Sequence, residues 1–228
     1  MNYGEIVQLG RHRLMCGDAT KYEDIEQLLG GDRVNLVLTD PPYGINYVGN
    51  KPRVVGGGTF KHKPVIGDNN NNAFKNHYRH IRKLTDSMII WGGQNFTECL
   101  PPSYGWLFWD KSRSDKLSFG DGELAWTNVS TRLRKYSFKR NGFLTAGDKP
   151  LNQRVHPTQK PVELHMQILE DFTEPGDVIL DCFGGSGTTL IACQLTGRRC
   201  LMMELSPEYC GIITKRYQTL TEGMINYA

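Results

Sequence analysis

The sequence predicts an α/β domain built on a mostly parallel sheet with helices on both faces. Short apolar runs such as 34–39 and 178–180 alternate with segments whose apolar residues recur at helical spacing. Strands that alternate with helices in this way usually pair in parallel, and they need helices on both sides to cover their apolar faces. At 228 residues the chain is long enough for one such domain and too short for two comfortable ones.

The first half of the chain alternates strands and helices that end at recognisable stops. Short apolar runs indicate strands, and an amphipathic stretch closed by Gly30 and Gly31 indicates the first helix. Residues 45 to about 73 are rich in glycine and asparagine, so we expect a long mobile loop there, of the kind that often serves as a lid or binding segment. The expected strands are 12–16, 34–39, 88–91, 106–109 and 123–126, and the expected helices are 22–29 and 74–84.

The second half continues the alternation after residue 160. Pro161 suits the first turn of a helix whose apolar residues share one face, and Gly197 is placed to end the next helix. Ser206 followed by Pro207 is a typical start of a last helix. The expected helices are 162–172, 190–195 and a segment after 206, and the expected strands are 178–180 and 200–203.

The composition is that of an ordinary soluble protein, with 39% hydrophobic and 22% charged residues. No apolar run is long enough to span a bilayer, and the first residues lack the features of a signal peptide, so we expect a cytoplasmic protein without a membrane partner. The six cysteines form no C-x-x-C pair, and His77 and His80 have no nearby cysteine or carboxylate cluster. We therefore expect buried free thiols, structural histidines and no metal site.

Two segments concentrate basic residues without any acidic residue between them. Such segments suit a groove for a polyanion, and they also suit solvated loops, which are the commoner explanation of a charge run. The first, 45–67, contains Lys51, Arg53, Lys61 and Lys63, and the second, 124–147, contains Arg132, Arg134, Lys135, Lys139 and Arg140.

Asp40-Pro41-Pro42-Tyr43 follows directly after the apolar run 34–39. Two consecutive prolines cannot continue a strand, so the strand must end there. The turn then presents a carboxylate, free backbone carbonyls and an aromatic ring. A planar group with an exocyclic amine suits these groups, because the amine can donate to the carboxylate and a prolyl carbonyl while the ring stacks on the plane. The alternative is an ordinary Asp-Pro turn with an aromatic residue.

A glycine-rich turn lies between the expected strand 178–180 and the following helix. Its glycines let the backbone approach a ligand closely. Glu204 lies 23 residues beyond Asp181 at the end of the next strand, where nucleotide-binding α/β units place the carboxylate that accepts ribose hydroxyls. The turn lacks both the dinucleotide fingerprint and G-K-[ST], so a ligand with adenosine but no phosphate suits it better. A plain tight turn and a helix-entry acid are the alternatives.

Three segments resemble motifs of the amino-methyltransferases that act on DNA bases. Asp40–Tyr43 resembles their motif IV, Asp181–Thr189 resembles their S-adenosylmethionine-binding motif I, and His156–Pro161 resembles their motif X. The order of the three is that of the β-class, a circularly permuted arrangement. The resemblance spans about residues 12–220, nearly the whole chain.

The resemblance implies a Rossmann-like, S-adenosylmethionine-dependent methyltransferase fold as a single domain over residues 1–228. A catalytic half would span about 12–126, and a cofactor half about 156–220. The segment 127–155 between them would be a short target-recognition region, with basic residues for phosphates and aromatic rings for bases. Its shortness suggests a short or relaxed recognition sequence, or help from the 45–73 loop.

The resemblance also implies which residues would form the site. The catalytic residues would be Asp40, Pro41, Pro42 and Tyr43. Thr158 could instead be only a helix cap, and Asp18 could belong to a simple turn. The residues that would bind S-adenosylmethionine are Asp18, Asp40, Thr158, Gln159, Lys160, Asp181, Phe183, Gly184, Gly185, Ser186, Gly187, Thr188 and Glu204.

The expected reaction is methylation of adenine N6 in double-stranded DNA. An aromatic amine is a poor nucleophile, and Asp40 with the Pro41 carbonyl can accept its N–H groups and free its lone pair. Within a duplex the base must be flipped out, and Tyr43 is placed to stack on it. Asp at the first motif position resembles the adenine-N6 enzymes more than the cytosine-N4 enzymes, which usually carry Ser there.

Other functions stay open on the sequence alone. They are cytosine-N4 methylation, nucleic-acid binding without turnover, and methylation of RNA or of a protein glutamine. The glutamine enzymes usually begin the catalytic motif with Asn and place motif I first. The resemblance adds a homodimer and a cognate endonuclease as candidate partners.

Overall fold

The computed structural model describes residues 1–44, 72–111, 120–139 and 159–225, and it also describes the backbone of four short strands. The described residues form a nine-stranded sheet in the order β1-β2-β13-β12-β3-β6-β8-β7-β9. Its strands are β1 (Ile6–Leu9), β2 (His12–Cys16), β3 (Leu36–Thr39), β6 (Met88–Trp91), β7 (Gly105–Asp110), β8 (Gly122–Thr127), β9 (Leu133–Ser137), β12 (Val178–Asp181) and β13 (Arg199–Glu204). The pairs β4 (Arg53–Val55) with β5 (Gly58–Phe60) and β10 (Thr145–Ala146) with β11 (Lys149–Pro150) lie outside it.

The centre of the sheet is parallel, as the sequence predicts. Strands β2, β13, β12, β3 and β6 pair in parallel with their neighbours. Antiparallel pairs join β1 to β2 and join β8 to both β6 and β7, and β9 adds a parallel edge beside β7. The predicted α/β class with a mostly parallel sheet is therefore confirmed, and the antiparallel part is confined to one edge strand and the β8 hairpin.

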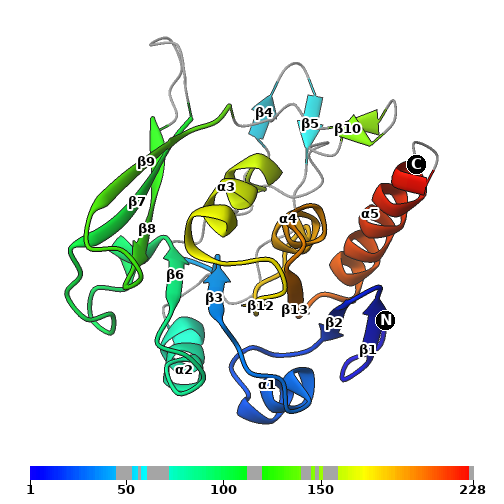
Figure 1. Ribbon diagram of the computed structural model, residues 1–228, viewed down its shortest axis with the longest axis horizontal. Coiled ribbons are helices and arrows are strands. Elements are labelled where there is room, and N and C mark those ends of the chain that lie inside the picture. Colours follow the sequence, from blue (N-terminus) through cyan, green and yellow to red (C-terminus); the bar gives the residue numbers. More distant parts are fainter. Residues whose placement is uncertain are drawn as a thin grey trace.

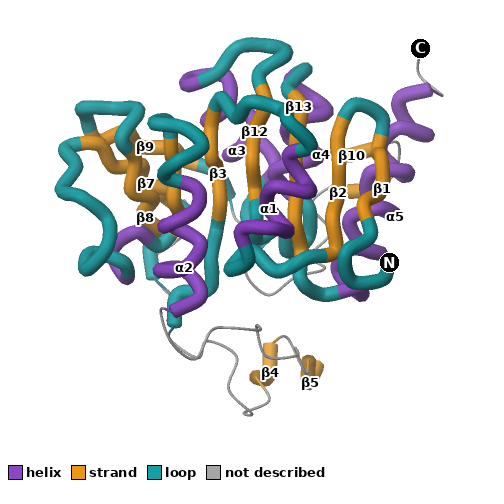
Figure 2. Tube along the Cα trace, turned by 90° about the horizontal axis from the view of Figure 1, so that it is seen from below, coloured by secondary structure: helices purple, strands orange, loops and turns teal. Residues whose placement is uncertain are grey.

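Helices cover both faces of the sheet, as Figure 1 shows. Helices α3, α4 and α5 lie over one face, and α1 and α2 lie over the other, which faces the viewer in Figure 2. Two clusters of buried apolar residues correspond to these two faces. The helices are α1 (Tyr22–Leu29), α2 (Asn72–Ile81), α3 (Val162–Phe172), α4 (Thr188–Thr196) and α5 (Pro207–Ile225), with a short 3-10 helix η1 (Gly93–Asn95) after β6.

The bounds of one expected helix were wrong, and one strand was not expected. The helix expected at 74–84 is α2, which begins at Asn72 and ends at Ile81, because Lys83 and Leu84 donate to residues only three positions back and so form turns. The apolar residues of the segment 133–137 do not recur at a regular spacing, yet the segment forms edge strand β9. An edge strand needs little burial, and in β9 only Tyr136 is buried, so its sequence carries almost no alternation.

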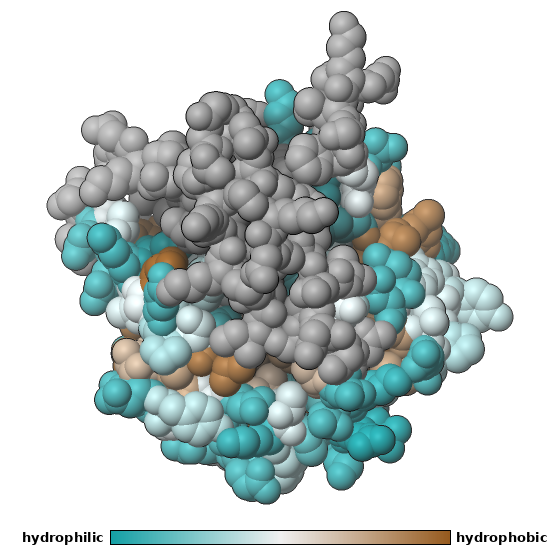
Figure 3. All heavy atoms as spheres, turned by 180° about the vertical axis from the view of Figure 1, so that it is seen from behind, coloured by the Kyte–Doolittle hydropathy of each residue, from teal (hydrophilic) through white to brown (hydrophobic). Residues whose placement is uncertain are grey.

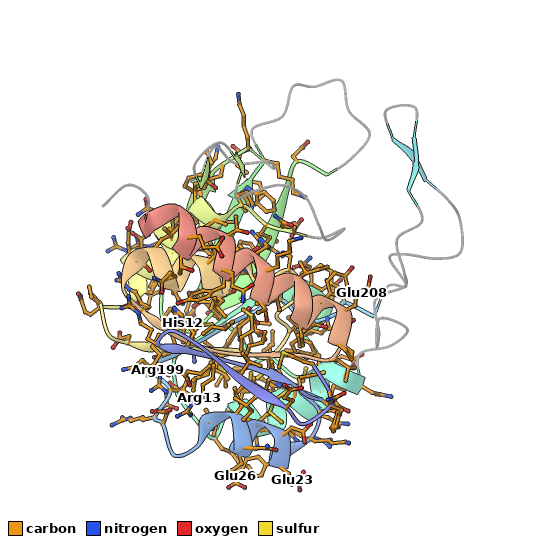
Figure 4. The ribbon with its side chains drawn as sticks, turned by 90° about the vertical axis from the view of Figure 1, so that its right-hand side faces the viewer. His12, Arg13, Glu23, Glu26, Arg199 and Glu208 are labelled. Atoms are coloured by element: carbon orange, nitrogen blue, oxygen red, sulfur yellow. The ribbon has the colours of Figure 1, made fainter. Side chains whose placement is uncertain are left out.

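A buried histidine and an ion-paired aspartate tie β2 and β13 to their surroundings. His12 is fully buried, accepts the Cys200 N–H at Nδ1 (2.9 Å) and lies 2.8 Å from the Gln194 side-chain oxygen at Nε2. Burial lowers the pKa of His12 to about 4, so the ring is neutral at physiological pH. Arg13 and Arg199 lie near His12 (Figure 4). Both bind Asp32 in the loop after α1.

The free cysteines expected to be buried, at 182, 193 and 200, are buried. In the described part of the chain every helix is too short or too polar to cross a membrane.

Candidate active site

The two turns singled out in the sequence open at the same edge of the sheet. Strands β3 and β12 are parallel neighbours, with Leu36 beside Ile179 and Val37 beside Leu180. Both strands therefore end at the same edge, where the turns after them begin. The Thr39 hydroxyl at the end of β3 donates to Asp181 Oδ1 at the end of β12 (2.9 Å) and links the two turns directly.

Asp40 begins the first turn and is held by two donors. Its Oδ1 accepts the Tyr43 hydroxyl (2.7 Å), and its Oδ2 accepts Lys160 Nζ. The Asp40 side chain is 23% exposed. Burial raises the pKa of Asp40 above its ordinary value, and the Lys160 ammonium offsets part of this rise. The carboxylate is thus partly open to solvent and already paired.

Lys160, which was predicted to bind the cofactor, is the buried ion-pair partner of Asp40. Its side chain is only 2% exposed, and Nζ lies 3.2 Å from Glu123 Oε2 and 4.8 Å from the centre of the Trp91 ring. Burial alone would lower the pKa of Lys160, but the two carboxylates outweigh burial and raise it. The ammonium therefore stays charged while it joins the turn after β3 to strand β8.

Glu123 is a site residue that the sequence analysis missed, because it was only the first residue of an expected strand. It lies near the start of β8, before the buried residues of that strand, and its Oε1 accepts Lys111 Nζ (2.8 Å). Burial pushes its pKa upward, but Lys160 and Lys111 prevail and lower the pKa of Glu123 to about 2. A signal existed in the sequence, since Lys111 and Glu123 flank the connection between two neighbouring strands, but spacing alone does not show that their side chains meet.

Tyr43 lies against β6 and the turn that follows it. Its ring contacts Phe96 edge to face, with ring centres 6.3 Å apart. Gly92 has a φ of +68°, and a Cβ at this position would overlap the Tyr43 ring. Gly92 is therefore required both for its backbone conformation and for the close approach of Tyr43.

Asp181 lies at the end of β12 and holds the glycine-rich turn that follows. It is 4% exposed and accepts hydrogen bonds from Thr39, from the Thr189 hydroxyl (2.6 Å) and from the Phe183 N–H (3.2 Å). Burial raises the pKa of Asp181 to about 6, and these hydrogen bonds limit the rise. These contacts hold Asp181 to the end of β3, to the start of α4 and to the glycine-rich turn.

Glu204 lies beside the same turn at the end of β13. Its two oxygens accept the Gly185 N–H (2.7 Å) and the Ser206 N–H (2.8 Å). Burial raises the pKa of Glu204 to about 7, although these N–H groups favour its ionised form. The predicted carboxylate and the predicted glycines are thus in contact.

Other predicted cofactor residues surround this turn. The Phe183 ring meets His77 edge to face at 4.9 Å, and His77 in turn donates to the Ala19 carbonyl (3.1 Å) beside Asp18. Asp18 itself accepts the backbone N–H and the hydroxyl of Thr20, which is the geometry of a simple turn. Ser186 in the turn and Thr188 at the start of α4 are buried, and the Thr188 hydroxyl lies 3.4 Å from the Lys160 carbonyl oxygen. Gln159 and Pro42 are partly buried and Pro41 is buried, whereas Thr158 lies outside the described residues.

The predicted nucleic-acid cations are only partly described. Arg134 pairs with Asp171 (3.3 Å) and Lys135 pairs with Asp110 (2.7 Å), so each is already neutralised at the edge of the sheet. Arg132 and Lys139 are exposed. On the face shown in Figure 3, most of the surface formed by described residues is hydrophilic. The side chains of Lys51, Arg53, Lys61, Lys63 and Arg140 lie outside the described residues.

Within the described ranges, no group of three or more His, Cys, Asp or Glu side chains is arranged to hold a metal ion.

Comparison with known proteins gives the class of the chain. Residues 65–215, more than half of the sequence, match the family model described as DNA methylase, of the N6/N4 type. The chain therefore belongs to this DNA methylase family. The match begins after the Asp40–Tyr43 turn, so the family assignment does not depend on that turn.

Individual relatives agree with this class. The chain is 28% identical over 219 residues to YubD of Escherichia coli (strain K12), with 86% of each chain covered. It is 40% identical over 121 residues to the type II methyltransferase M2.MboI of Moraxella bovis, which covers 53% of this chain and 43% of that enzyme.

Solved structures share the fold at low sequence identity. The M1.HpyAVI–SAM complex matches with a TM-score of 0.53 at 21% identity, covering 89% of this chain and 98% of that one. The PvuII DNA methyltransferase (cytosine-N4-specific) matches with a TM-score of 0.59 at 16% identity, covering 99% and 96%. The protein is a DNA methyltransferase of the N6/N4 family.

Proposed function

We propose that this methyltransferase methylates the exocyclic N6 of an adenine that is flipped out of double-stranded DNA. The observation that carries the proposal is the position of the Asp40 carboxylate, which lies at the same sheet edge as the glycine-rich turn after β12 and is linked to it through Thr39 and Asp181. A carboxylate acceptor and a turn that would hold S-adenosylmethionine would then face one site, as in-line transfer requires.

Asp40 and the Pro41 carbonyl would bind the two N–H groups of the adenine amine. These hydrogen bonds free the nitrogen lone pair, and the carboxylate stabilises the positive charge that develops on the nitrogen more strongly than it stabilised the neutral amine. The bound cofactor supplies an electrophilic methyl group on a sulfonium. The methylated nitrogen then loses one proton, to Asp40 or to water, and leaves the neutral N-methyl amine.

Tyr43 would stack on the flipped base. Stacking on an aromatic ring contributes about 1–3 kcal/mol per base, which offsets much of the unpairing cost of a few kcal/mol. In the structure the Tyr43 hydroxyl donates to Asp40. The incoming amine needs acceptor capacity on this carboxylate, so base binding would loosen the Tyr43–Asp40 hydrogen bond.

The residues around the second turn suit the cofactor. Glu204 has a carboxylate beside the Gly185 backbone and would accept the ribose hydroxyls, and Phe183 would provide an apolar wall for the adenine ring. Gln159 and Lys160 lie on the chain that enters α3 and would face the methionine end, together with Thr158. Asp18 would lie near the adenine ring.

Cofactor binding is expected to depend on pH through Glu204. Its pKa of about 7 lies above its ordinary value, so the carboxylate is lost as pH falls through 7. Because the ionised form is the better acceptor for two hydroxyls, the dissociation constant for S-adenosylmethionine should rise by about tenfold between pH 8 and pH 6. Isothermal titration across this range measures the effect.

The matched variants make this test specific. Glu204→Gln should bind more weakly at pH 8 and should lose the pH dependence, whereas Glu208→Gln on the exposed first turn of α5 should behave as wild type. Equal affinities of wild type and Glu204→Gln at both pH values would contradict the assigned role.

The base is tested by analysing the product. Purified protein is incubated with S-adenosylmethionine carrying a labelled methyl group and with duplex DNA of mixed sequence, and the DNA is digested to nucleosides. We expect the label in N6-methyldeoxyadenosine. Label in N4-methyldeoxycytidine would instead support the chemistry named for the PvuII enzyme. Parallel reactions offer RNA and protein as acceptors, and label in these but not in DNA would overturn a DNA substrate.

The basic residues at 132–139, together with Lys51, Arg53, Lys61, Lys63 and Arg140, would contact phosphates of the duplex. A homodimer and a cognate endonuclease remain predictions from the resemblance to the β-class enzymes.

A further inference from the structure

Four side chains of alternating charge form a continuous line that ends at the candidate catalytic carboxylate. Lys111 follows β7, Glu123 lies on β8, Lys160 precedes α3 and Asp40 follows β3. The contacts run from Lys111 Nζ to Glu123 Oε1 (2.8 Å), from Glu123 Oε2 to Lys160 Nζ (3.2 Å), and from Lys160 Nζ to Asp40 Oδ2. The charges cancel along the line.

The hairpin of β7 and β8 fixes Glu123 in place. Glu123 pairs with Trp109 across the hairpin, and the Lys111 ammonium lies over the Trp109 ring at 5.1 Å from its centre. The Lys111 N–H also donates to the Asp121 carbonyl (3.0 Å) and extends the ladder beyond β7. Glu123 is therefore held by a rigid element rather than by a surface loop.

The four side chains of this line are largely buried, and burying their charges costs free energy. The side chains of Lys160 and Lys111 are 2% and 11% exposed, and those of Asp40 and Glu123 are 23% and 29% exposed. Buried ionic groups with perturbed pKa values concentrate at functional sites. Only Asp40 and Lys160 are explained by the proposed methyl transfer, so Glu123 and Lys111 need a separate account.

The geometry at Lys160 indicates what Glu123 does. An ammonium has three N–H donors, and here one points to Asp40 and one to Glu123, while Trp91 lies 4.8 Å away. Without Glu123 the ammonium could settle entirely on Asp40. It would then occupy acceptor positions that the adenine amine needs, and its charge would offset the negative charge of Asp40 that stabilises the nitrogen as it becomes positive.

We propose that Glu123, braced by Lys111, is a positioning residue that shares the Lys160 ammonium with Asp40 and so keeps Asp40 available as the acceptor of the target amine. This inference rests on the proposed role of Asp40 in methyl transfer. Glu123 acts through Lys160 and makes no contact of its own with the reacting atoms.

The effects of the neighbouring charges on the pKa of Asp40 agree with this role. Burial raises the pKa of Asp40, Lys160 lowers it, and Glu123 raises it again. The other groups that face this cluster are the Tyr43 hydroxyl on Asp40, the Asp181 carboxyl behind the turn, and His165, whose ring stacks on Trp91 and whose pKa burial lowers to about 3. Removing the charge of Glu123 should therefore lower the pKa of Asp40.

The test is the pH profile of the isosteric variant Glu123→Gln in the methylation assay. We expect kcat to fall roughly 10- to 100-fold, the scale of a misplaced catalytic group, with cofactor affinity within about threefold of wild type. We also expect the acid limb of the kcat/KM profile to move to lower pH, a shift that a merely structural role would not produce.

Three further variants complete the experiment. Glu123→Asp keeps the charge and should keep the acid limb at the wild-type position. Lys111→Met leaves the charge of Glu123 but removes its brace, so kcat should fall less than in Glu123→Gln. Glu98→Gln breaks the exposed pair with Lys75 (2.6 Å) and should change neither quantity.

The inference is overturned if Glu123→Gln keeps the wild-type kcat and pH profile. It is also overturned if the acid limb stays in place while kcat falls, or if Glu123→Asp shifts the limb although its charge is retained. A wild-type protein that methylates no DNA would instead refute the proposed function, and the two failures are therefore distinguishable.

Discussion

Replacing Asp40 with alanine is expected to slow methyl transfer by at least about 100-fold, while the affinity for S-adenosylmethionine is largely retained. The carboxylate is the group that stabilises the developing charge on the target amine, and its removal leaves the Lys160 ammonium paired with Glu123 alone beside that nitrogen. Single-turnover kinetics with saturating cofactor measure the chemical step, and calorimetric titration measures cofactor affinity.

Two further variants separate chemistry from packing. Asp40→Asn keeps the shape of the side chain and should be nearly as slow, because its amide cannot supply the negative charge. Asp86→Ala, at an exposed position before β6, should leave the rate unchanged. If Asp40→Ala methylates DNA at the wild-type rate, the catalytic assignment is wrong.

Replacing Lys160 with methionine is expected to lower the free energy of unfolding by about 3–5 kcal/mol at neutral pH. The substitution keeps the apolar stem but removes the ammonium, so Asp40 and Glu123 are left as neighbouring, partly buried carboxylates without this cation. Such a loss exceeds the usual effect of a single substitution. Chemical denaturation of wild type and variant measures it.

The destabilisation should depend on pH with a definite sign. In the wild type the pKa of Glu123 is about 2, below its ordinary value of 4.5, so its ionised form stabilises the fold above pH 4.5 and this stabilisation is lost as pH falls toward 2. In Lys160→Met the ionised form of Glu123 stabilises the fold less even at neutral pH. The carboxyls of Glu123 and Asp40 then bind protons more readily as the pH falls. The difference between the two proteins should therefore shrink as pH falls below 4.5.

A matched lysine controls for the loss of charge alone. Lys75 forms an exposed pair with Glu98, and Lys75→Met should have a much smaller effect at every pH. Equal effects of the two substitutions, or an effect of Lys160→Met that is independent of pH, would contradict the role assigned to the buried ammonium.

Much of the architecture could be predicted from local pattern. The apolar run before Asp40 and the run before Asp181 are confirmed as the buried strands β3 and β12, because a continuous apolar run that ends in a turn signal has few other structures available. The edge strands β1 and β9 were not predicted. They are half exposed, so burial imposes little pattern on their sequences.

The residues of the candidate site were also predicted only in part. Glu204 beside Gly185, and Asp40 beside Lys160, are brought together from residues that spacing and resemblance had already singled out. Glu123 was missed because its significance depends on a contact across the sheet with a residue far away in the chain. The pairing of Arg134 and Lys135 with acidic side chains was equally hidden, since a basic run does not reveal its distant partners.

The most direct measurement is a crystal structure of the protein with bound cofactor. The account predicts the ribose at Glu204 and the methyl-bearing sulfur facing Asp40 and Lys160, with space for an amine at in-line distance, about 3–3.5 Å from the methyl carbon. A cofactor whose sulfur points away from Asp40, or one that binds elsewhere than at the turn after β12, would contradict it.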